Sequence, residues 1–225
     1  MTVFVNLDAG ELPDESPELW SLADVINCAC GGHAGDAASM ARVAGFCASA
    51  KVGLGAHPSY PDRENFGRVS LAIDPAALAD SIAAQCRALA SAASSAGTQV
   101  TSMKPHGALY HDVAKGEALA VAVIRATVEA LGNDLLVIGP PHGALHAAAT
   151  RYALRYAREG FADRAMRPDG SLVPRAEPGA LITDPDEAAA QAQRLTAQVD
   201  TICVHGDTPN ALAIGRAVRA ALQPR

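Results

Sequence analysis

The feature that most constrains the fold of this chain is a recurring unit, in which a short apolar run precedes a polar loop and then a helix-like pattern. The runs fall at 3–7, 25–29, 52–56, 100–104, 135–139, 154–156 and 201–204. Several of them lack polar alternation, which is typical of parallel strands covered on both faces. The repeat therefore predicts an α/β fold, with parallel strands joined by helices.

Helix starts are marked where a side-chain oxygen precedes a proline, at Asp74-Pro75, Asp184-Pro185 and Thr208-Pro209. Such an oxygen caps free N–H groups, and proline fits the first helical position. Gly97 predicts the end of the long alanine-rich helix. Because composition does not change along the chain, we expect one domain, 1–225, folded as a single seven-stranded (β/α) barrel. An open, doubly wound sheet is the alternative, since strand order cannot be read from one sequence.

Charge and composition exclude several classes of partner. The net charge is −6 without a run of Lys or Arg, and four Phe, four Tyr and one Trp are too few for a stacking platform, so we expect no nucleic-acid binding. Neither a signal peptide nor an apolar span is evident, so we expect no membrane association. Five cysteines, an odd number, predict reduced thiols and a cytoplasmic location.

One cysteine pair is a candidate for metal binding. Cys28 and Cys30 could supply two thiolates, with His33 as a third ligand. A second Cys pair that would complete a tetrahedral zinc site is missing. The pattern favours buried, small apolar side chains instead.

Polar residues concentrate just after the predicted strands. Five of the seven histidines do so: His33, His57, His106, His142 and His205. In a parallel barrel all carboxyl ends of the strands open on one face, so these imidazoles should converge there. The other ionisable residues at such positions are Asp8, Glu11, Asp36, Asp62, Arg63, Lys104 and Asp207. This face is the predicted site.

Some of these residues have plain structural interpretations. Asp36 is placed to cap a helix, Asp207 to orient a loop amide, and His142 to occupy a turn. His33 differs, because flanking glycines let the backbone approach a ligand. Lys104 would be costly to bury without a partner.

The set suggests two kinds of chemistry. Asp8 and Glu11 could act as general bases toward water, while Lys104 and His106 stabilise an oxyanion. Alternatively, Asp8, His33 and His57 could hold a divalent metal with open positions for water. The motifs of a nucleotide cradle are missing. The irregular segment 161–182 is long enough to be a functional loop.

Together, these segments resemble the lactam-utilisation (LamB/YcsF) family. The similarity runs from the first strand to the last helix. It rests on VNLDAGE (5–11), NCACGGHAGD (27–36), GAHPSYPD (55–62), FGR (66–68), KPHGALY (104–110), FADRA (161–165), PDGSLVPR (168–175) and VHGD (204–207).

The resemblance implies a seven-stranded barrel related to carbohydrate deacetylases. It also implies a role as one component of a bacterial 5-oxoprolinase, which opens 5-oxoproline (pyroglutamate) to L-glutamate with ATP. The partners would be subunits B and C, which resemble the halves of allophanate hydrolase, a urea-derivative hydrolase. The implied catalytic residues are Asp8, Glu11, His33, Lys104 and His106. The implied substrate-binding residues are Asn6, His57, Asp62, Arg68, Arg164, His205 and Asp207.

The sequence departs from the family pattern at two positions and two segments. Phe4 stands where an acidic residue is usual, and Gly32 where Phe is common. The stretches 11–22 and 193–199 are shorter than usual. A shortened loop would reshape the pocket, which is compatible with a different lactam or cyclic amide as the substrate. The sequence is also compatible with a metal-dependent amidohydrolase or deacetylase that works alone, and with a non-catalytic component that binds the lactam.

Overall fold

The computed structural model describes residues 3–167, 171–175 and 177–222. Its strands are Phe4–Ala9 (β1), Val25–Ala29 (β2), Gly53–His57 (β3), Val100–Met103 (β4), Leu136–Gly139 (β5), Arg155–Phe161 (β6) and Thr201–His205 (β7). The helices are Pro17–Trp20 (α1), Ala37–Ala50 (α2), Pro75–Ser95 (α3), Gly107–Lys115 (α4), Glu117–Leu131 (α5), Ala144–Arg151 (α6), Pro185–Leu195 (α7) and Ala211–Leu222 (α8).

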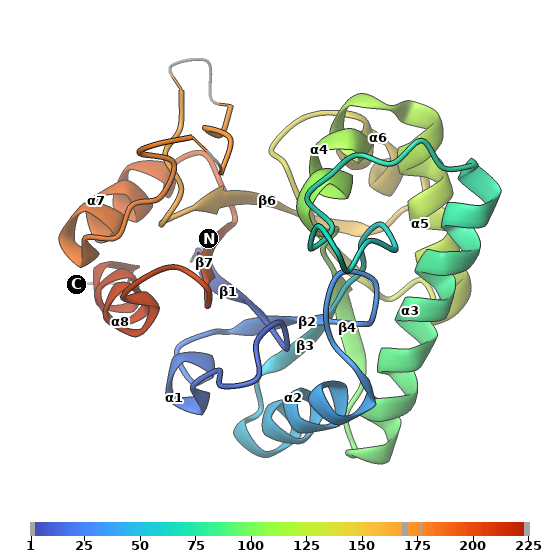
Figure 1. The fold of residues 1–225 in the computed structure, drawn as a ribbon, viewed down its shortest axis with the longest axis horizontal. Helices are drawn as coiled ribbons and strands as arrows, with labels where there is room; N and C mark the ends of the chain where they lie inside the picture. Colours follow the sequence, from blue (N-terminus) through green and yellow to red (C-terminus); the bar gives the residue numbers. More distant parts are fainter. Residues whose placement is uncertain (1–2, 168–170, 176, 223–225) are drawn as a thin grey trace.

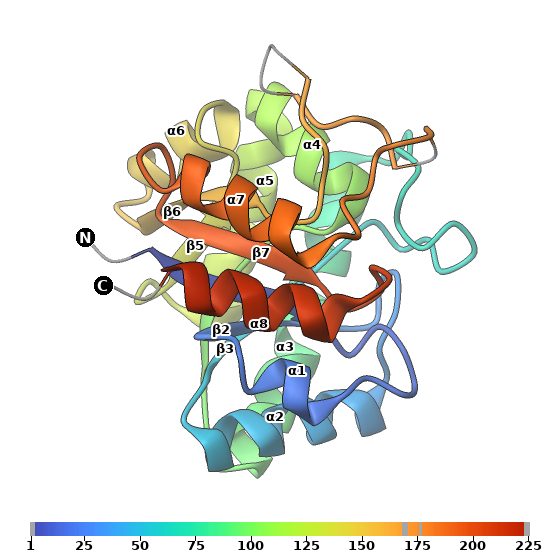
Figure 2. The same ribbon diagram turned by 90° about the vertical axis from the view of Figure 1, so that its left-hand side faces the viewer.

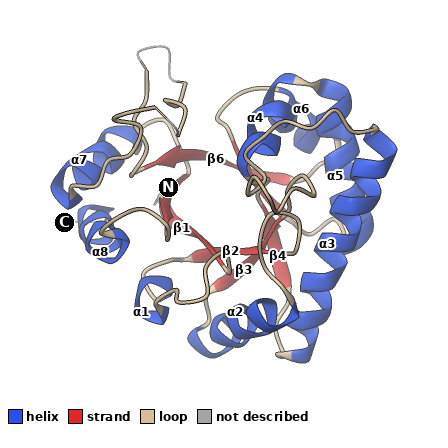
Figure 3. Ribbon diagram, in the orientation of Figure 1, coloured by secondary structure: helices blue, strands red, loops and turns tan. Residues whose placement is uncertain are grey.

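The strands form a closed, all-parallel barrel in the order β1-β2-β3-β4-β5-β6-β7. The helices surround it (Figures 1 and 3). Closure comes from β1, which pairs with β2 on one side and with β7 on the other. The predicted α/β barrel is therefore confirmed, and the open-sheet alternative is wrong.

The inside of the barrel is polar, whereas the layer between strands and helices is apolar. On β1, Val5 and Leu7 belong to the hydrophobic core. The alternate residue Asn6 donates to Thr201 Oγ1 across the strand pair at 2.9 Å, and its Oδ1 accepts from Asn27 Nδ2 at 2.8 Å. The expectation of strands apolar on both faces is therefore wrong for this part of the barrel. Paired amides and hydroxyls replace the usual apolar filling.

Most helix boundaries follow the capping signals. Asp74 and Asp184 each accept two backbone N–H bonds at the starts of α3 and α7, and Asp36 caps α2 by accepting from Ser39 N. The signal at Thr208-Pro209 is misplaced, because α8 begins at Ala211. The Thr208 hydroxyl donates instead to Asp163 Oδ2 at 2.6 Å, so it serves the site described below.

The five cysteines are buried, unpaired thiols. The clusters of metal-ligating side chains formed by the described residues include neither Cys28 nor Cys30. Burial raises the pKa of Cys30 well above its ordinary value. The interpretation of this pair as small core residues fits the structure, and the structural zinc does not.

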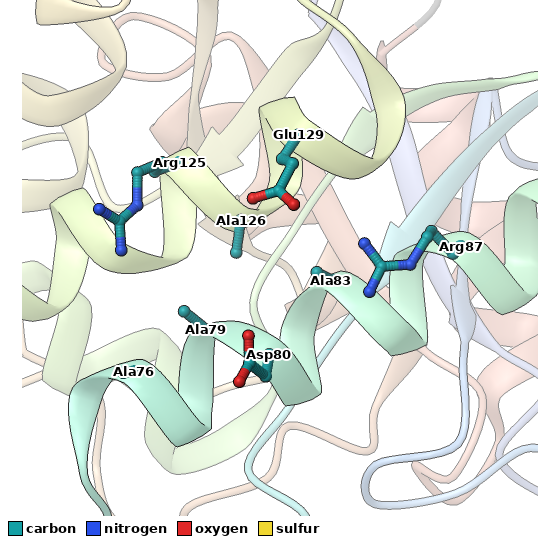
Figure 4. Close-up of a pocket in the computed structure, with 8 residues that line it drawn as sticks. All are labelled: Ala76, Ala79, Asp80, Ala83, Arg87, Arg125, Ala126 and Glu129. Carbon is teal, nitrogen blue, oxygen red and sulfur yellow. The ribbon is translucent and has the colours of Figure 1, made fainter.

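A hollow lies between α3 and α5 on the outer wall of the barrel (Figure 4). It is lined by Ala76, Ala79, Asp80, Ala83, Arg87, Arg125, Ala126 and Glu129. None of the predicted site residues lines it, so it is separate from the site. Within the described ranges, no helix combines the length and apolar character needed to cross a membrane.

Candidate active site

The long loops emerge on the side where the strands end (Figure 2, right). Ionisable side chains of the residues at these strand ends lie close together. We call this group the polar centre. It consists of Asp8, Glu11, His33, His57, Lys104, His106 and His205. The structure thus brings together side chains that lie almost 200 positions apart in sequence.

The Lys104 ammonium is buried between two carboxylates. Its Nζ donates to Asp8 Oδ1 at 2.9 Å and lies 2.8 Å from Glu159 Oε1. Cys203 Sγ is 3.1 Å away. Burial alone would lower the pKa of Lys104, but the carboxylates of Asp8 and Glu159 raise it well above the ordinary value. Lys104 is therefore charged at neutral pH, and its donors face the interior of the barrel.

Asp8 connects this interior ion pair to the histidines. Its Oδ1 also accepts from Asn27 Nδ2 at 2.9 Å, and its Oδ2 lies 3.4 Å from His57 Nε2 and 3.8 Å from His205 Nε2. Burial would raise the pKa of Asp8, but His57 and Lys104 outweigh it and hold this pKa well below the usual value. Asp8 is therefore an ionised carboxylate, fixed on three sides.

Glu11 Oε1 is surrounded by three imidazoles. It lies 3.0 Å from His33 Nε2, 3.3 Å from His106 Nδ1 and 3.7 Å from His57 Nε2. The rings of His33 and His106 are stacked, with centroids 3.5 Å apart. Burial lowers the pKa of His33 to about 3 and also lowers that of His106. These two imidazoles are therefore neutral at pH 7.

A turn after β1 points Glu11 at the histidines. Gly10 has φ +75°, a conformation that favours glycine. The Glu15 carboxylate accepts from the backbone N–H groups of Gly10, Glu11 and Leu12 at 2.6, 2.7 and 2.9 Å. Glu15 is thus a positioning residue, which holds the turn without reaching the histidines.

Backbone carbonyls fix the orientation of two histidines. His57 Nδ1 donates to Lys104 O at 2.8 Å, and His106 Nε2 donates to Phe66 O at 2.9 Å, because a carbonyl oxygen only accepts. When both rings are neutral, the other two nitrogens therefore carry lone pairs, and these nitrogens lie 3.0 Å apart. Because two lone pairs repel each other at this distance, a proton or a cation is needed between His57 Nε2 and His106 Nδ1.

The side chains that could hold such a cation are Glu11, His33, His57 and His106, whose ligand atoms lie within 4.8 Å of one another. The sequence alone suggests Asp8 together with His33 and His57. The structure groups Asp8 instead with Cys203 and His205. The difference arises from the Gly10 turn, which places Glu11 among the imidazoles.

His205 forms a dyad with a second carboxylate. Its Nδ1 donates to Asp163 Oδ1 at 2.8 Å, and Asp163 Oδ2 accepts from Thr208 Oγ1 at 2.6 Å. Burial would lower the pKa of His205, but Asp163 raises it above the ordinary value. His205 is thus held in one orientation, with Nε2 toward Asp8 and its protonated form favoured.

The loop between β3 and α3 lies over the histidines. The Phe66 ring meets the rings of His33 and His106 edge-on, with centroids 5.2 and 5.5 Å apart. The carbonyl of Gly67 accepts from Ala108 N at 2.9 Å. The start of α4 therefore anchors this loop.

The close approach at this anchor makes Gly107 sensitive to substitution. Its φ is +56°, and a Cβ there would lie 2.4 Å from Gly67 O. We expect Gly107→Ala to lower the free energy of unfolding by about 1–3 kcal/mol. Gly45→Ala, on an open face of α2, should raise it by about 0.5–1 kcal/mol. Urea denaturation measures both changes. If the two substitutions changed the free energy of unfolding equally, the close contact between Gly107 and Gly67 would not be important for stability.

Further charged residues form a second layer on the loops. Asp207, which we expected to orient a loop amide, is instead bonded to two arginines: Arg68 Nη2 and Arg175 Nη2 donate to its carboxylate at 2.8 and 2.6 Å. Arg164 is buried beside them, with Nη2 donating to Val173 O at 2.8 Å. Residues 168–170 of the motif at 168–175 lie outside the described residues.

Three other predicted residues are not members of the polar centre. Asn6 is fully buried below it and accepts from Lys104 Nζ at 3.4 Å. Asp62 accepts from Asn65 N at 3.1 Å and so shapes its own loop. His142 is exposed in the segment between β5 and α6. These positions favour supporting roles for Asn6 and Asp62, and the turn interpretation for His142.

The two departures from the family pattern have different surroundings. At Gly32, a Cβ would lie 2.4 Å from Ser59 Oγ and 2.5 Å from Gln85 Oε1. Gln85 bonds both backbone groups of Ser59, so it fills the space that a larger residue at 32 would need. Phe4 stands at the start of β1, four residues before Asp8 or roughly 13 Å along the strand. An acidic residue there would not reach the polar centre.

Three residues that contact the polar centre were not predicted from the sequence: Glu159, Asp163 and Cys203. The alternation of side chains along a strand could have indicated them, because residues two apart face the same side of the sheet. Glu159 and Asp163 each lie two positions from Phe161. Cys203 lies between Thr201 and His205 in the same way. The weak apolar run at 154–156 hid the true extent of β6.

Comparison with known proteins decides the family. The model of the LamB/YcsF family matches residues 6–225. The chain belongs to the LamB/YcsF family. Two relatives, each named as the A subunit of 5-oxoprolinase, are similar over nearly the whole chain. The one from Methylococcus capsulatus is 42% identical, covering 100% of this chain and 93% of the relative. The one from Streptomyces griseus is 41% identical, covering 97% and 95%.

Solved structures agree with this membership. A lactam utilization protein from Thermus thermophilus superposes with a TM-score of 0.89 at 33% identity, covering 99% of this chain and 96% of the other. A structure described as T48 deacetylase with substrate has a TM-score of 0.50 at 10% identity, covering 98% and 84%. The LamB/YcsF barrel therefore shares its fold with a deacetylase.

Proposed function

We propose that this chain is the A subunit of an ATP-dependent 5-oxoprolinase. The complex hydrolyses 5-oxo-L-proline to L-glutamate, while ATP goes to ADP and phosphate. Relatives that match the whole chain carry this name. The partners are subunits B and C, which resemble the halves of allophanate hydrolase. The buried, free thiols fit a cytoplasmic complex.

The observation that carries the proposal is the pairing of an ionised carboxylate with a proton donor. Asp8 Oδ2 lies 3.8 Å from Nε2 of His205, whose pKa is raised by Asp163. Lactam hydrolysis needs both functions, because water must lose a proton and the ring nitrogen must gain one. Asp8 orients and deprotonates the water, and His205 protonates the nitrogen as the C–N bond breaks.

The use of ATP is consistent with a site whose proposed base is weak. A five-membered lactam is an unstrained amide, so its opening needs coupling. A carboxylate with a low pKa is a weak base. Transfer of the γ-phosphoryl group of ATP to the amide oxygen, with release of ADP, would make the carbon more electrophilic, so that a weak base suffices. After water adds and the C–N bond breaks, the acyl phosphate that remains is hydrolysed by a second water to the free carboxylate and phosphate. Glu11, His33 and His106 line the same site, and Lys104 acts through Asp8.

The test is release of glutamate from 5-oxo-L-proline by the purified chain with candidate subunits B and C and ATP. We expect glutamate and ADP in equal amounts, and none when ATP or any of the three proteins is omitted. Full activity of the chain alone, without ATP, would contradict the proposal. If another lactam were the preferred substrate, the ATP-dependent opening of a lactam would stand, but 5-oxo-L-proline as the substrate would be wrong.

A metal-dependent amidohydrolase is the second candidate. The close approach of His57 Nε2 and His106 Nδ1, 3.0 Å apart, favours it, because imidazole nitrogens and a carboxylate suit a divalent cation such as Zn²⁺. Glu11, His33, His57 and His106 would hold the ion. Bound there, it would polarise a carbonyl and lower the pKa of a water molecule.

Metal binding by the purified protein decides between the candidates. If the site holds Zn²⁺, elemental analysis should find one ion per chain, and chelation should lower the melting temperature. Glu11→Gln should weaken binding about tenfold or more, as expected for loss of a charged ligand, whereas His142→Gln should not. Less than a tenth of an equivalent of any divalent metal, with activity unchanged by chelation, would exclude this candidate.

A further inference from the structure

Two arginines share one carboxylate beside the polar centre, and a third arginine lies close to these two. Arg68 lies on the loop after β3, Arg164 and Arg175 on the loop after β6, and Asp207 on the loop after β7. Asp207 Oδ2 accepts from Arg68 Nη2 at 2.8 Å, and Asp207 Oδ1 accepts from Arg175 Nη2 at 2.6 Å. We call Arg68, Arg164 and Arg175 the arginine cluster.

The charges in this cluster are not balanced. Asp207 neutralises one of the three guanidinium groups. Asp163, the carboxylate whose charge acts on Arg164, is already hydrogen-bonded to His205 and Thr208. Burial and the neighbouring Arg175 lower the pKa of Arg164, since its charge is poorly compensated. Counted over the described residues, the cluster therefore retains two positive charges that an anion would satisfy.

Arg164 also has an unused donor. Its side chain is buried, with 8% of the residue exposed, and its Nε has no hydrogen-bond partner among the described residues. An unpaired, buried donor costs free energy unless a ligand completes it. Arg175, with 19% of its side chain exposed, keeps the cluster open to solvent. A small anion could therefore reach Arg164.

The cluster is close to the reacting groups. Arg164 follows Asp163, which orients His205. Arg68 lies over the Phe66 ring, 4.6 Å from its centroid, and Phe66 contacts His33. A ligand that spans the two places needs an anion at one end and a reactive carbonyl at the other. In 5-oxo-L-proline both groups are substituents of one small ring.

We propose that the arginine cluster binds the carboxylate of the lactam substrate, with Arg164 as the principal donor. Asp207 pairs with Arg68 and Arg175 and holds these two side chains in place, so that Arg164 is left to bind the ligand. A planar guanidinium matches a carboxylate in a bidentate manner. The identity of the ring as a lactam rests on the proposed function, whereas the carboxylate site does not.

The experiment is calorimetric titration of the full chain with three ligands. These are 5-oxo-L-proline, 2-pyrrolidinone, which lacks the carboxylate, and cyclopentanecarboxylate, which lacks the lactam. We expect Arg164→Met to weaken binding of both carboxylates by about 10- to 100-fold, as for other charged hydrogen bonds, and 2-pyrrolidinone by less than twofold. Arg167→Met, on the same loop and paired with Glu177, is the matched control.

Each outcome has a defined meaning. Binding of cyclopentanecarboxylate that depends on Arg164, without binding of either lactam, would uphold the site and overturn the proposed function. Equal losses for 2-pyrrolidinone and 5-oxo-L-proline, or no loss, would overturn the site, as would inorganic phosphate binding more tightly than both carboxylates. Failure of the wild type to bind either carboxylate would also overturn it. If Arg164→Met does not fold, the more exposed Arg175→Met should give the same selective loss.

Discussion

Asp8→Asn is expected to lower kcat for lactam hydrolysis by about a thousandfold or more. The substitution removes the carboxylate that faces both His57 and His205 and keeps nearly the same shape. It also places an amide beside Lys104, which then keeps Glu159 as its only carboxylate partner among the described residues. The loss should appear in single-turnover glutamate release by the complete complex.

A surface carboxylate provides the control for Asp8→Asn. Asp134 pairs with Arg155 at the exterior, and Asp134→Asn should leave kcat within about twofold, as expected for an exposed pair. Circular dichroism shows whether both variants are folded. If Asp8→Asn weakened lactam binding but did not slow turnover of bound substrate, the chain would serve only to bind the lactam, with Asp8 excluded as the base.

The repeat in the sequence was sufficient to predict the barrel. Each apolar run became a strand, and the run at 25–29 coincides with β2. An apolar run indicates a strand that is buried between the sheet and the helices, and it can be recognised from a few consecutive residues. The inward-facing residues follow a different rule, since Asn6, Asn27 and Thr201 are buried by pairing with one another. A single strand does not reveal a partner that is supplied by another strand.

The site was predictable to the extent that topology alone places residues. Residues after parallel strands must share one face, and Asp8, His57 and His205 do. Which atoms touch depends on loop conformation. The Glu15 bonds that hold the Gly10 turn bring Glu11 to the imidazoles, and no sequence period encodes that turn.

The interior ion pairs also explain why the proposed base, Asp8, and the proposed acid, His205, favour opposite protonation states. Asp8 is ionised because His57 and Lys104 lower its pKa, whereas the protonated form of His205 is favoured because the adjacent Asp163 raises its pKa. The protonation state of each of these two groups therefore depends on a neighbouring group of opposite charge: Lys104 for Asp8, and Asp163 for His205. A substitution of such a neighbouring group should change the site even where the reacting groups themselves are intact.

Lys104→Met should therefore have the largest effect on stability. It leaves Asp8 and Glu159 buried without the cation that bridges them at 2.9 and 2.8 Å. Breaking a buried pair in this way costs about 3–5 kcal/mol, which corresponds to a fall in melting temperature of roughly 6–20 °C. Lys115→Met, at an exposed helix end, should change the free energy of unfolding by less than about 1 kcal/mol.

A double variant separates lost charge compensation from lost packing. When Glu159→Gln is added to Lys104→Met, one of the two uncompensated carboxylates disappears, so part of the stability should return. The double variant should then be more stable than the sum of the single effects by about 1–3 kcal/mol, the range found for residues in one network. Strictly additive effects in urea denaturation would mean that Lys104 stabilises the barrel by filling space. In that case the low pKa of Asp8 would have to come from His57 rather than from the lysine.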